Sequence, residues 1–167
     1  MEREQLEREL SLLHESSYGW ALACCARDRD EASDVLQDVY FKMLSGRVRW
    51  DGRSALKTFV FGVIRLTAME RRRWRFFRGR VVSGAEPDDV PAPSAPLVDR
   101  QTAEAIARAL AKLSERQREV LHLVFYEGLS IAEASIVMKV SLGTARVHYE
   151  RGKAEMLLML QKEGVTL

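Results

Sequence analysis

Apolar residues in the first half of the chain recur at the three- and four-residue spacing of amphipathic helices. One stripe predicts a single long helix, and its positions are Leu6, Leu10, Leu13, Ser17, Trp20 and Cys24. A second stripe predicts another helix, with core-facing positions at Ala32, Val35, Leu36, Val39, Tyr40, Met43 and Leu44. A loop is predicted at 46–54, after which Ser54 is placed to cap a third helix that runs from about Ala55 into an arginine-rich segment.

The second half of the chain carries explicit signals for helix starts and stops. Capping-box patterns occur at Ser114-Glu-Arg-Gln117 and Ser130-Ile-Ala-Glu133, with Gly128 as a stop between them. Ser141 follows a short turn and opens a last helix. These signals, with a stripe at Ala103, Ile106, Ala107, Leu110 and Leu113, predict helices at 102–113, 115–126, 131–138 and 142–161. Strand alternation is absent, so the predicted fold class is all-α.

The last two predicted helices have the proportions of a helix-turn-helix, within SIAEASIVMKVSLGTARVHYERGK (130–153). The residues expected to pack across the turn are Ile131, Ala134, Ser135 and Met138 against Val140, Leu142, Ala145 and Tyr149. The outward positions of the last helix are then Gly143, Thr144, Arg146, Val147, His148, Glu150 and Arg151. An amphipathic hairpin with a solvated face is the alternative. The caps, the small residues at the helix start and the turn length favour DNA reading.

A proline-rich acidic segment, SGAEPDDVPAPSAPLVDR (83–100), contains all four prolines of the chain. It has no aromatic residue and few large apolar ones, so it cannot build a core, and its prolines favour extended backbone. The predicted architecture is therefore two small helical domains, 1–81 and 102–167, joined by a flexible linker at 82–101 and with the helix-turn-helix in the second domain.

Positive charge is concentrated in one segment, RLTAMERRRWRFFRGR (65–80). The formal net charge of the chain is only +2, whereas this segment holds seven arginines and one glutamate. Such a patch is typical of a polyanion partner, although a solvated helix end gives the same pattern. Trp74 and Phe77 are three residues apart, and the pattern leaves open whether they pack in the core or stack on bases.

Other classes of function receive little support from the sequence. The cysteines, Cys24 and Cys25, are adjacent, and His14 is the only nearby histidine, so neither a metal site nor a disulfide is expected. No catalytic set or phosphate-binding loop occurs, and we expect no cofactor and no enzymatic activity. The apolar runs are too short for a membrane span and the N-terminus is charged, which predicts a cytoplasmic protein without membrane insertion.

Three motifs, in order, resemble the extracytoplasmic-function (ECF) sigma factors of bacterial transcription. DEASDVLQDVYFKM (30–43) resembles the helix that docks on the clamp helices of the largest RNA polymerase subunit. WDGRSALKTFVFGVIRLTAMERRR (50–73) resembles the segment that melts promoter DNA and holds the −10 element. LAKLSERQREVLHLVFYEGLSIAEASIVMKVSLGTARVHYERGKAEML (110–157) resembles the domain that reads the −35 element. The resemblance covers nearly the whole chain.

This resemblance implies a role for each matching residue. Asp34, Gln37 and Asp38, which by themselves would pass for a solvated polar face, match polymerase-binding positions. The loop positions that match those capturing an unpaired −10 base are Arg49, Trp50, Asp51, Gly52, Arg53 and Ser54. The positions that match further −10 contacts are Lys57, Arg65, Leu66, Arg71, Arg72 and Arg73. Contacts to the −35 element fall to Ser141, Thr144, Arg146, Val147, His148 and Arg151, with Arg116 and Arg118 near its phosphates. The implied partners are core RNA polymerase (clamp helices and flap), promoter DNA as duplex and melted strand, and an anti-sigma factor.

Two positions depart from the family pattern. Leu66 stands where the family usually carries an asparagine that helps to hold the flipped base, and leucine has no hydrogen-bonding group. We therefore expect altered −10 recognition, or recognition that depends more on the loop. Val147 and His148 replace a small polar residue followed by arginine, which predicts a shifted −35 preference.

Two rival interpretations remain at the level of sequence. A regulator of the two-component type has a similar SERQREVL…EGLS run, but its receiver domain would need an α/β pattern that the N-terminal half lacks. A sigma-like protein that only sequesters an anti-sigma factor is compatible with Leu66. The arginine-rich segment 65–80 and the last helix of the predicted helix-turn-helix, here called the recognition helix, favour a sigma factor that binds DNA.

Overall fold

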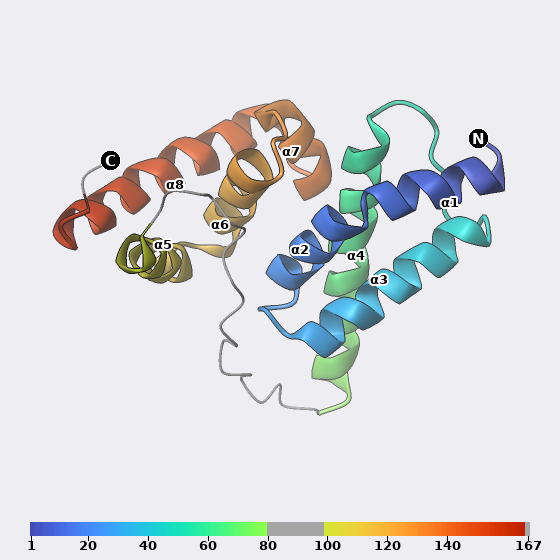
Figure 1. The fold of residues 1–167 in the computed structure, drawn as a ribbon, viewed down its shortest axis with the longest axis horizontal. Coiled ribbons are helices and arrows are strands. Elements are labelled where there is room, and N and C mark those ends of the chain that lie inside the picture. The colour runs from blue at the N-terminus through green and yellow to red at the C-terminus, as the bar shows by residue number, and fades with distance from the viewer. Residues whose placement is uncertain (80–98, 166–167) are drawn as a thin grey trace. The chain divides into compact units, whose positions relative to one another are not determined.

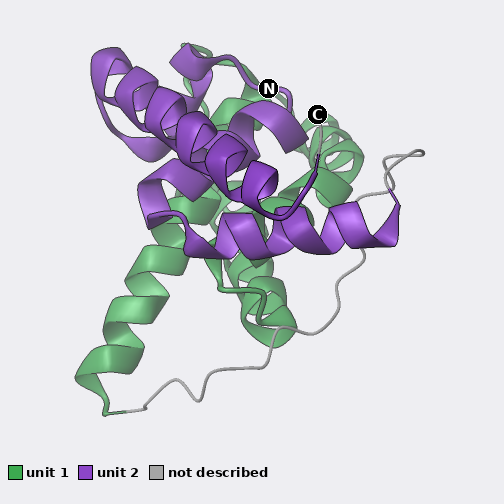
Figure 2. Ribbon diagram, turned by 90° about the vertical axis from the view of Figure 1, so that its left-hand side faces the viewer, with its two compact units in different colours: residues 1–88 green, residues 89–167 purple. Residues whose placement is uncertain are grey.

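The computed structural model describes residues 1–79 and 99–165, and in these ranges the chain is helical with no strand. The chain divides into two compact units, Met1–Asp88 and Asp89–Leu167 (Figure 2). The all-α prediction and the division into two units are thus confirmed. The predicted linker, 82–101, lies largely outside the described residues. None of the helices that the structure describes is both long and apolar enough to cross a lipid bilayer.

The first unit is built from α1 (Arg3–Leu12), α2 (His14–Cys24), α3 (Arg29–Leu44) and α4 (Leu56–Phe77). Helices α2, α3 and α4 pack against one another around its core (Figure 1). The ring of Trp20 is fully buried and stacks on Phe61 with 6.0 Å between centroids. Its indole N–H donates to the carbonyl oxygen of Phe61 at 3.0 Å, so the buried polar atom of this large side chain is satisfied.

The prediction of one long helix over Leu6 to Cys24 is wrong, because the helix is interrupted at one residue. Leu13 separates α1 from α2, although its amide still donates to Glu9 and its carbonyl still accepts from the amide of Ser17. The hydroxyl of Ser16 also donates to that carbonyl, at 3.2 Å. Serine side chains that bond back to the preceding turn compete with the backbone ladder and bend helices, which the apolar spacing alone does not reveal.

The start of α4 also differs from the prediction. Ala55 occupies the capping position, with no side-chain hydrogen bond, and Ser54 contributes its carbonyl oxygen rather than its hydroxyl. That carbonyl accepts a 2.8 Å hydrogen bond from the indole N–H of Trp50. The serine therefore closes the preceding loop instead of capping the helix.

The second unit contains α5 (Arg100–Lys112), α6 (Glu115–Leu121), the π-helix η1 (His122–Tyr126), α7 (Ile131–Met138) and α8 (Leu142–Lys162). Both predicted capping boxes are confirmed, at Ser114 and Ser130. The helix predicted over 115–126 ends as a π-helix, in which the amide of Glu127 bonds to the carbonyl of His122. Helices α5, α6 and α7 all pack against α8 (Figure 1).

Helix α5 begins two residues earlier than predicted because Asp99 caps it. The Asp99 carboxylate accepts from the amide of Thr102 at 2.8 Å, and this hydrogen bond lowers the pKa of Asp99.

An ion pair joins α5 to the end of α8: Arg108 on α5 donates to Glu163, just past α8, at 2.7 Å. That bond lowers the pKa of Glu163, beside the small core formed by Ala105, Ala109 and Leu160.

A tight turn joins α7 to α8, as expected for a helix-turn-helix. Lys139 adopts the left-handed conformation (φ 52°) at the end of α7, and Ser141 caps α8 by accepting from the amide of Thr144 at 3.1 Å. Ala134, Met138 and Ala145 are buried as predicted. Leu142, the first residue of α8, is 38% exposed and so is less buried than the other residues predicted to pack across the turn.

Candidate nucleic-acid interface

The acidic residues predicted to bind a protein partner lie together on the surface of α3. The side chains of Asp34 and Asp38 are 57% and 46% exposed, and Gln37 is exposed between them. Their spacing of three and four residues places them on one face, away from the buried positions Val35 and Val39. The structure thus brings all three predicted residues into one surface.

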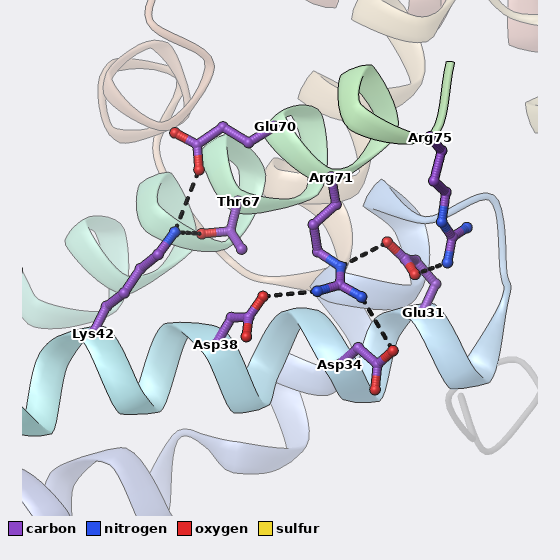
Figure 3. Close-up of polar contacts among 8 residues, drawn as sticks. All are labelled: Glu31, Asp34, Asp38, Lys42, Thr67, Glu70, Arg71 and Arg75. Atoms are coloured by element: carbon purple, nitrogen blue, oxygen red, sulfur yellow. Dashed lines mark hydrogen bonds and ion pairs between the residues drawn. The ribbon is translucent and has the colours of Figure 1, made fainter. Parts of the chain in front are cut away.

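Arg71 on α4 reaches across to this surface and binds three carboxylates of α3 (Figure 3). Its Nε donates to Glu31 Oε1 at 2.9 Å, its Nη1 to Asp38 Oδ2 at 2.8 Å and its Nη2 to Asp34 Oδ2 at 3.1 Å. The second oxygen of Glu31 accepts from Arg75. Glu31 is 6% exposed, and a buried carboxylate needs such partners because an unpaired charge in the interior is costly.

The predicted −10 residues of α4 separate into buried and exposed groups. Arg72 and Arg73 are exposed, and Leu66 is 40% exposed. Arg65 is buried, at 7% exposure, and Arg71 is half-buried in the carboxylate network. The structure therefore does not present the arginine run as one basic surface.

The predicted base-capturing loop is ordered by its own hydrogen bonds. Besides the bond from Trp50 to Ser54, the amide of Arg53 donates to Asp51 Oδ1 at 3.1 Å and its Nε pairs with Asp51 Oδ2 at 3.3 Å. Gly52 has φ 76°, a conformation that favours glycine. Arg49, Asp51 and Arg53 are exposed, while Lys57 is half-buried with its Nζ 5.2 Å from the Phe61 ring.

The aromatic residues at the end of α4 are on the surface of the described unit. Trp74 is 65% exposed, Phe76 82% and Phe77 75%, so the option of core packing for Trp74 and Phe77 is wrong. The guanidinium of Arg78 lies 5.7 Å from the Trp74 ring. Trp74 and Arg78 also line a groove of about 470 Å³ between α3 and α4, together with Asp34, Asp38, Lys42 and Arg71.

The predicted recognition helix, α8, presents most of its candidate residues to solvent. Thr144, Arg146, Val147 and Arg151 are exposed, and His148 is half-buried. The hydroxyl of Ser141 is engaged in the cap of the helix. In α6, Arg118 is exposed, whereas Arg116 is half-buried and pairs with Glu119 at 3.4 Å.

Two features near these sites were not predicted from the sequence. Glu31 is the buried acid that holds Arg71 and Arg75, and an acidic residue four positions before the buried Val35 was a usable signal. The π-helix η1 exposes Phe125, whose ring stacks on Tyr149 of α8 at 6.0 Å. No sequence pattern indicated the π-helix.

The neighbouring cysteines are free thiols in half-buried positions. Burial, together with the nearby Asp28 carboxylate, raises the pKa of the Cys25 thiol to about 11, so it stays protonated and weakly nucleophilic at neutral pH. Among residues 1–79 and 99–165, histidine, cysteine and acidic side chains form no group of three that could hold a metal ion.

Comparison with known proteins assigns both units to one family. Residues 10–89 match the family model of sigma-70 region 2, and residues 103–156 match the model of sigma-70 region 4. The chain belongs to the sigma-70 family. Its relatives place it in the ECF group, so the resemblance noted from the sequence is confirmed and the protein is an RNA polymerase sigma factor. Core polymerase and promoter DNA are the partners of this class.

The relatives of this sigma factor are distant but span most of the chain. It is 26% identical to the ECF sigma factor SigX of Bacillus subtilis over 133 residues, 75% of this chain and 69% of SigX. It is 29% identical to SigL of Mycobacterium tuberculosis over 145 residues, 83% of this chain and 80% of SigL. A solved structure with a similar fold is the sigma factor RpoE of Bartonella quintana in complex with the anti-sigma factor NepR. The TM-score is 0.75, with 21% identity over 95% of this chain and 98% of RpoE.

Proposed function

We propose that this sigma factor docks on core RNA polymerase through the exposed face of α3 formed by Asp34, Gln37 and Asp38. The observation that supports this most directly is the pair of half-exposed carboxylates, held at the surface in the region 2 unit. We propose the clamp helices of the largest polymerase subunit as the main contact and the flap as the contact of the second unit. Catalysis is then left to the polymerase, and the protein acts in the cytoplasm, where that enzyme works.

Recognition of the −10 element is proposed for the 49–54 loop together with the exposed part of α4. Trp50 and Arg53 belong to a loop that is already ordered by internal hydrogen bonds, and a preformed loop loses less entropy when it captures a base. Arg72 and Arg73 are exposed on α4 and would contact phosphates where the strands part. We leave Arg65 out of this surface because it is buried.

Recognition of the −35 element is proposed for the N-terminal half of α8. Thr144, Arg146, Val147 and Arg151 are exposed there, and the start of the helix carries the small residue Gly143. Arginine and threonine can hydrogen-bond base edges in the major groove, and the valine methyls can contact thymine. The exposed Arg118 of α6 would contact phosphate.

An anti-sigma factor is proposed as the inhibitory partner of this protein. The support is by analogy, because the fold neighbour RpoE was solved with NepR bound. A protein that only sequesters such an inhibitor would not need an exposed recognition helix, so we favour a sigma factor that works on promoters.

Reconstituted transcription tests the proposed function. The purified protein and core polymerase are incubated with a promoter library that is randomised at the −10 and −35 elements, and the transcripts are sequenced. We expect transcripts from a defined subset that carries a preference at both elements. A protein that binds DNA without polymerase would instead be a conventional regulator. One that binds neither core polymerase nor DNA, but captures an inhibitor, would be a sigma-like decoy.

A further inference from the structure

The contacts of Arg71 separate it from the other arginines of α4. Its three guanidinium nitrogens each donate to a different carboxylate, and all three acceptors belong to α3 (Figure 3). The side chain is 31% exposed, whereas Arg72 and Arg73 in the following positions are exposed. A guanidinium that is already engaged by three carboxylates would have to give up these bonds before it could bind a phosphate.

The same bonds fix the two surface carboxylates. Asp34 and Asp38 are four residues apart on α3, a spacing at which like charges repel. Arg71 donates to one oxygen of each, which offsets part of the repulsion and favours the orientation of both side chains seen in the structure. About half of each side chain stays exposed, so a partner can still reach them.

Glu31 supplies the anchor of this arrangement. It is buried, it accepts from Arg71 and Arg75, and it lies on α3 one turn before Asp34. Lys42 meanwhile binds Glu70, the residue that precedes Arg71, at 3.3 Å. The acid next to Arg71 in the sequence therefore has its own cation, which leaves the guanidinium of Arg71 to the carboxylates of α3.

We infer that Arg71 is a positioning residue for polymerase docking and does not contact promoter DNA. It holds Asp34 and Asp38 in the orientation in which the α3 face meets its partner, and the inference rests on the proposed function of that face. The arginine run therefore contains residues with two different tasks: Arg71 serves the protein interface, and Arg73 serves DNA.

The test separates core affinity from promoter opening. The affinity of labelled sigma factor for core polymerase is measured by fluorescence anisotropy, and open complexes are then counted at saturating sigma factor. We expect Arg71→Ala to weaken core binding about tenfold, the size of effect typical of a lost charged hydrogen bond, yet to form normal amounts of open complex at saturation. Arg73→Ala, the exposed neighbour, should show the opposite pattern: normal core binding and a promoter defect that persists at saturation.

Two further variants exclude a purely structural effect of losing Arg71. In a background carrying Asp34→Ala and Asp38→Ala, Arg71→Ala should change core affinity less than about twofold. The effects of substitutions that remove the same contact do not add. Arg71→Lys should recover only part of the core affinity, since one ammonium cannot match the planar fork of the guanidinium. Urea unfolding of each variant checks the fold, and the double aspartate variant alters only half-exposed surface side chains.

Each outcome decides a different question. If Asp34→Ala with Asp38→Ala leaves core binding unchanged, the proposed role of the α3 face is wrong. If that variant weakens binding but Arg71→Ala does not, the proposed function stands and our inference about Arg71 is overturned. A promoter defect of Arg71→Ala that persists at saturating sigma factor would also overturn it, because Arg71 would then act on DNA.

Discussion

Leu66 combines an unusual identity with a partly exposed position on α4. It lies five residues before Arg71, at the position where the family resemblance implies an asparagine. An aliphatic side chain excludes water but offers no donor or acceptor to a base edge. The −10 preference of this protein should therefore depend on the 49–54 loop more than on α4.

Substitution of Leu66 by asparagine tests this dependence. We predict that Leu66→Asn sharpens discrimination at one −10 base by about tenfold, since one good hydrogen-bonded base contact is worth about 1–3 kcal/mol. Folding stability should change little because the side chain is partly exposed. Transcription from a set of single-base −10 variants measures the effect. An unchanged base preference would mean that α4 does not approach the captured base.

Single residues were predicted well where the determining contact is local. Ser114, Ser130 and Ser141 were expected to cap helices, and each does so through an amide three residues later. The family resemblance implied a −10 contact for Arg71, which stands in a run of arginines. Its partners lie 33 to 40 positions away, on a different helix, and no pattern within α4 could indicate them.

At the scale of elements, the crossing of α6 and α8 depends on one glycine. A Cβ atom at Gly152 would lie 3.1 Å from Cβ of Gln117 and 3.2 Å from Cδ1 of Leu121. The absence of a side chain lets the two helices approach closely, and this contact holds α8 against α6.

A branched side chain at this crossing should separate the helices. We predict that Gly152→Val destabilises the second unit by about 1–3 kcal/mol, the usual cost of overpacking. Ala154→Val introduces the same residue at an exposed position of the same helix and should cost less than about 0.5 kcal/mol. Urea unfolding followed by circular dichroism compares the two variants. Equal stabilities would show that α6 can move away without loss.

The apolar spacing predicted where helices occur, but it did not predict where they are interrupted. The break at Leu13 is accompanied by a side-chain hydrogen bond from Ser16, and the π-helix at His122–Tyr126 by backbone bonds of a different period. Both sites keep an apolar stripe that reads as continuous helix. Hydrophobic periodicity reports which face is buried, and it carries little information about which carbonyl each amide selects.

At the scale of the whole molecule, each of the two units buries apolar side chains of its own. Trp20 and Phe61 are buried and stacked in the first unit, while Ala105, Ala109 and Leu160 form a cluster in the second. The proline-rich composition of the segment between them predicted two units, because a segment with few large apolar residues cannot itself build a core.

A compact unit that buries apolar side chains of its own is expected to fold when expressed alone. We predict that the fragments 1–81 and 99–167 both show helical circular dichroism and cooperative thermal unfolding. The second fragment should begin at Asp99, because a lost capping residue costs about 1 kcal/mol. The first fragment should bind core polymerase and the second should not compete with it for the clamp helices. An unfolded fragment would show that the units depend on each other.

The π-helix between α6 and α7 also has a meaning in evolutionary terms. A π-helix is an α-helix that has accepted an extra residue, and such insertions persist when a local gain offsets their poorer geometry. Val120 and Leu121 before it and Leu123 within it are all buried. Removing one residue from 122–126 would return the segment to regular α-helix, whereas a further inserted residue would turn everything on one side of it by about 100° relative to the other side, at 3.6 residues per turn. Further insertions should therefore be much rarer in this segment among close descendants of this gene than in the proline-rich segment.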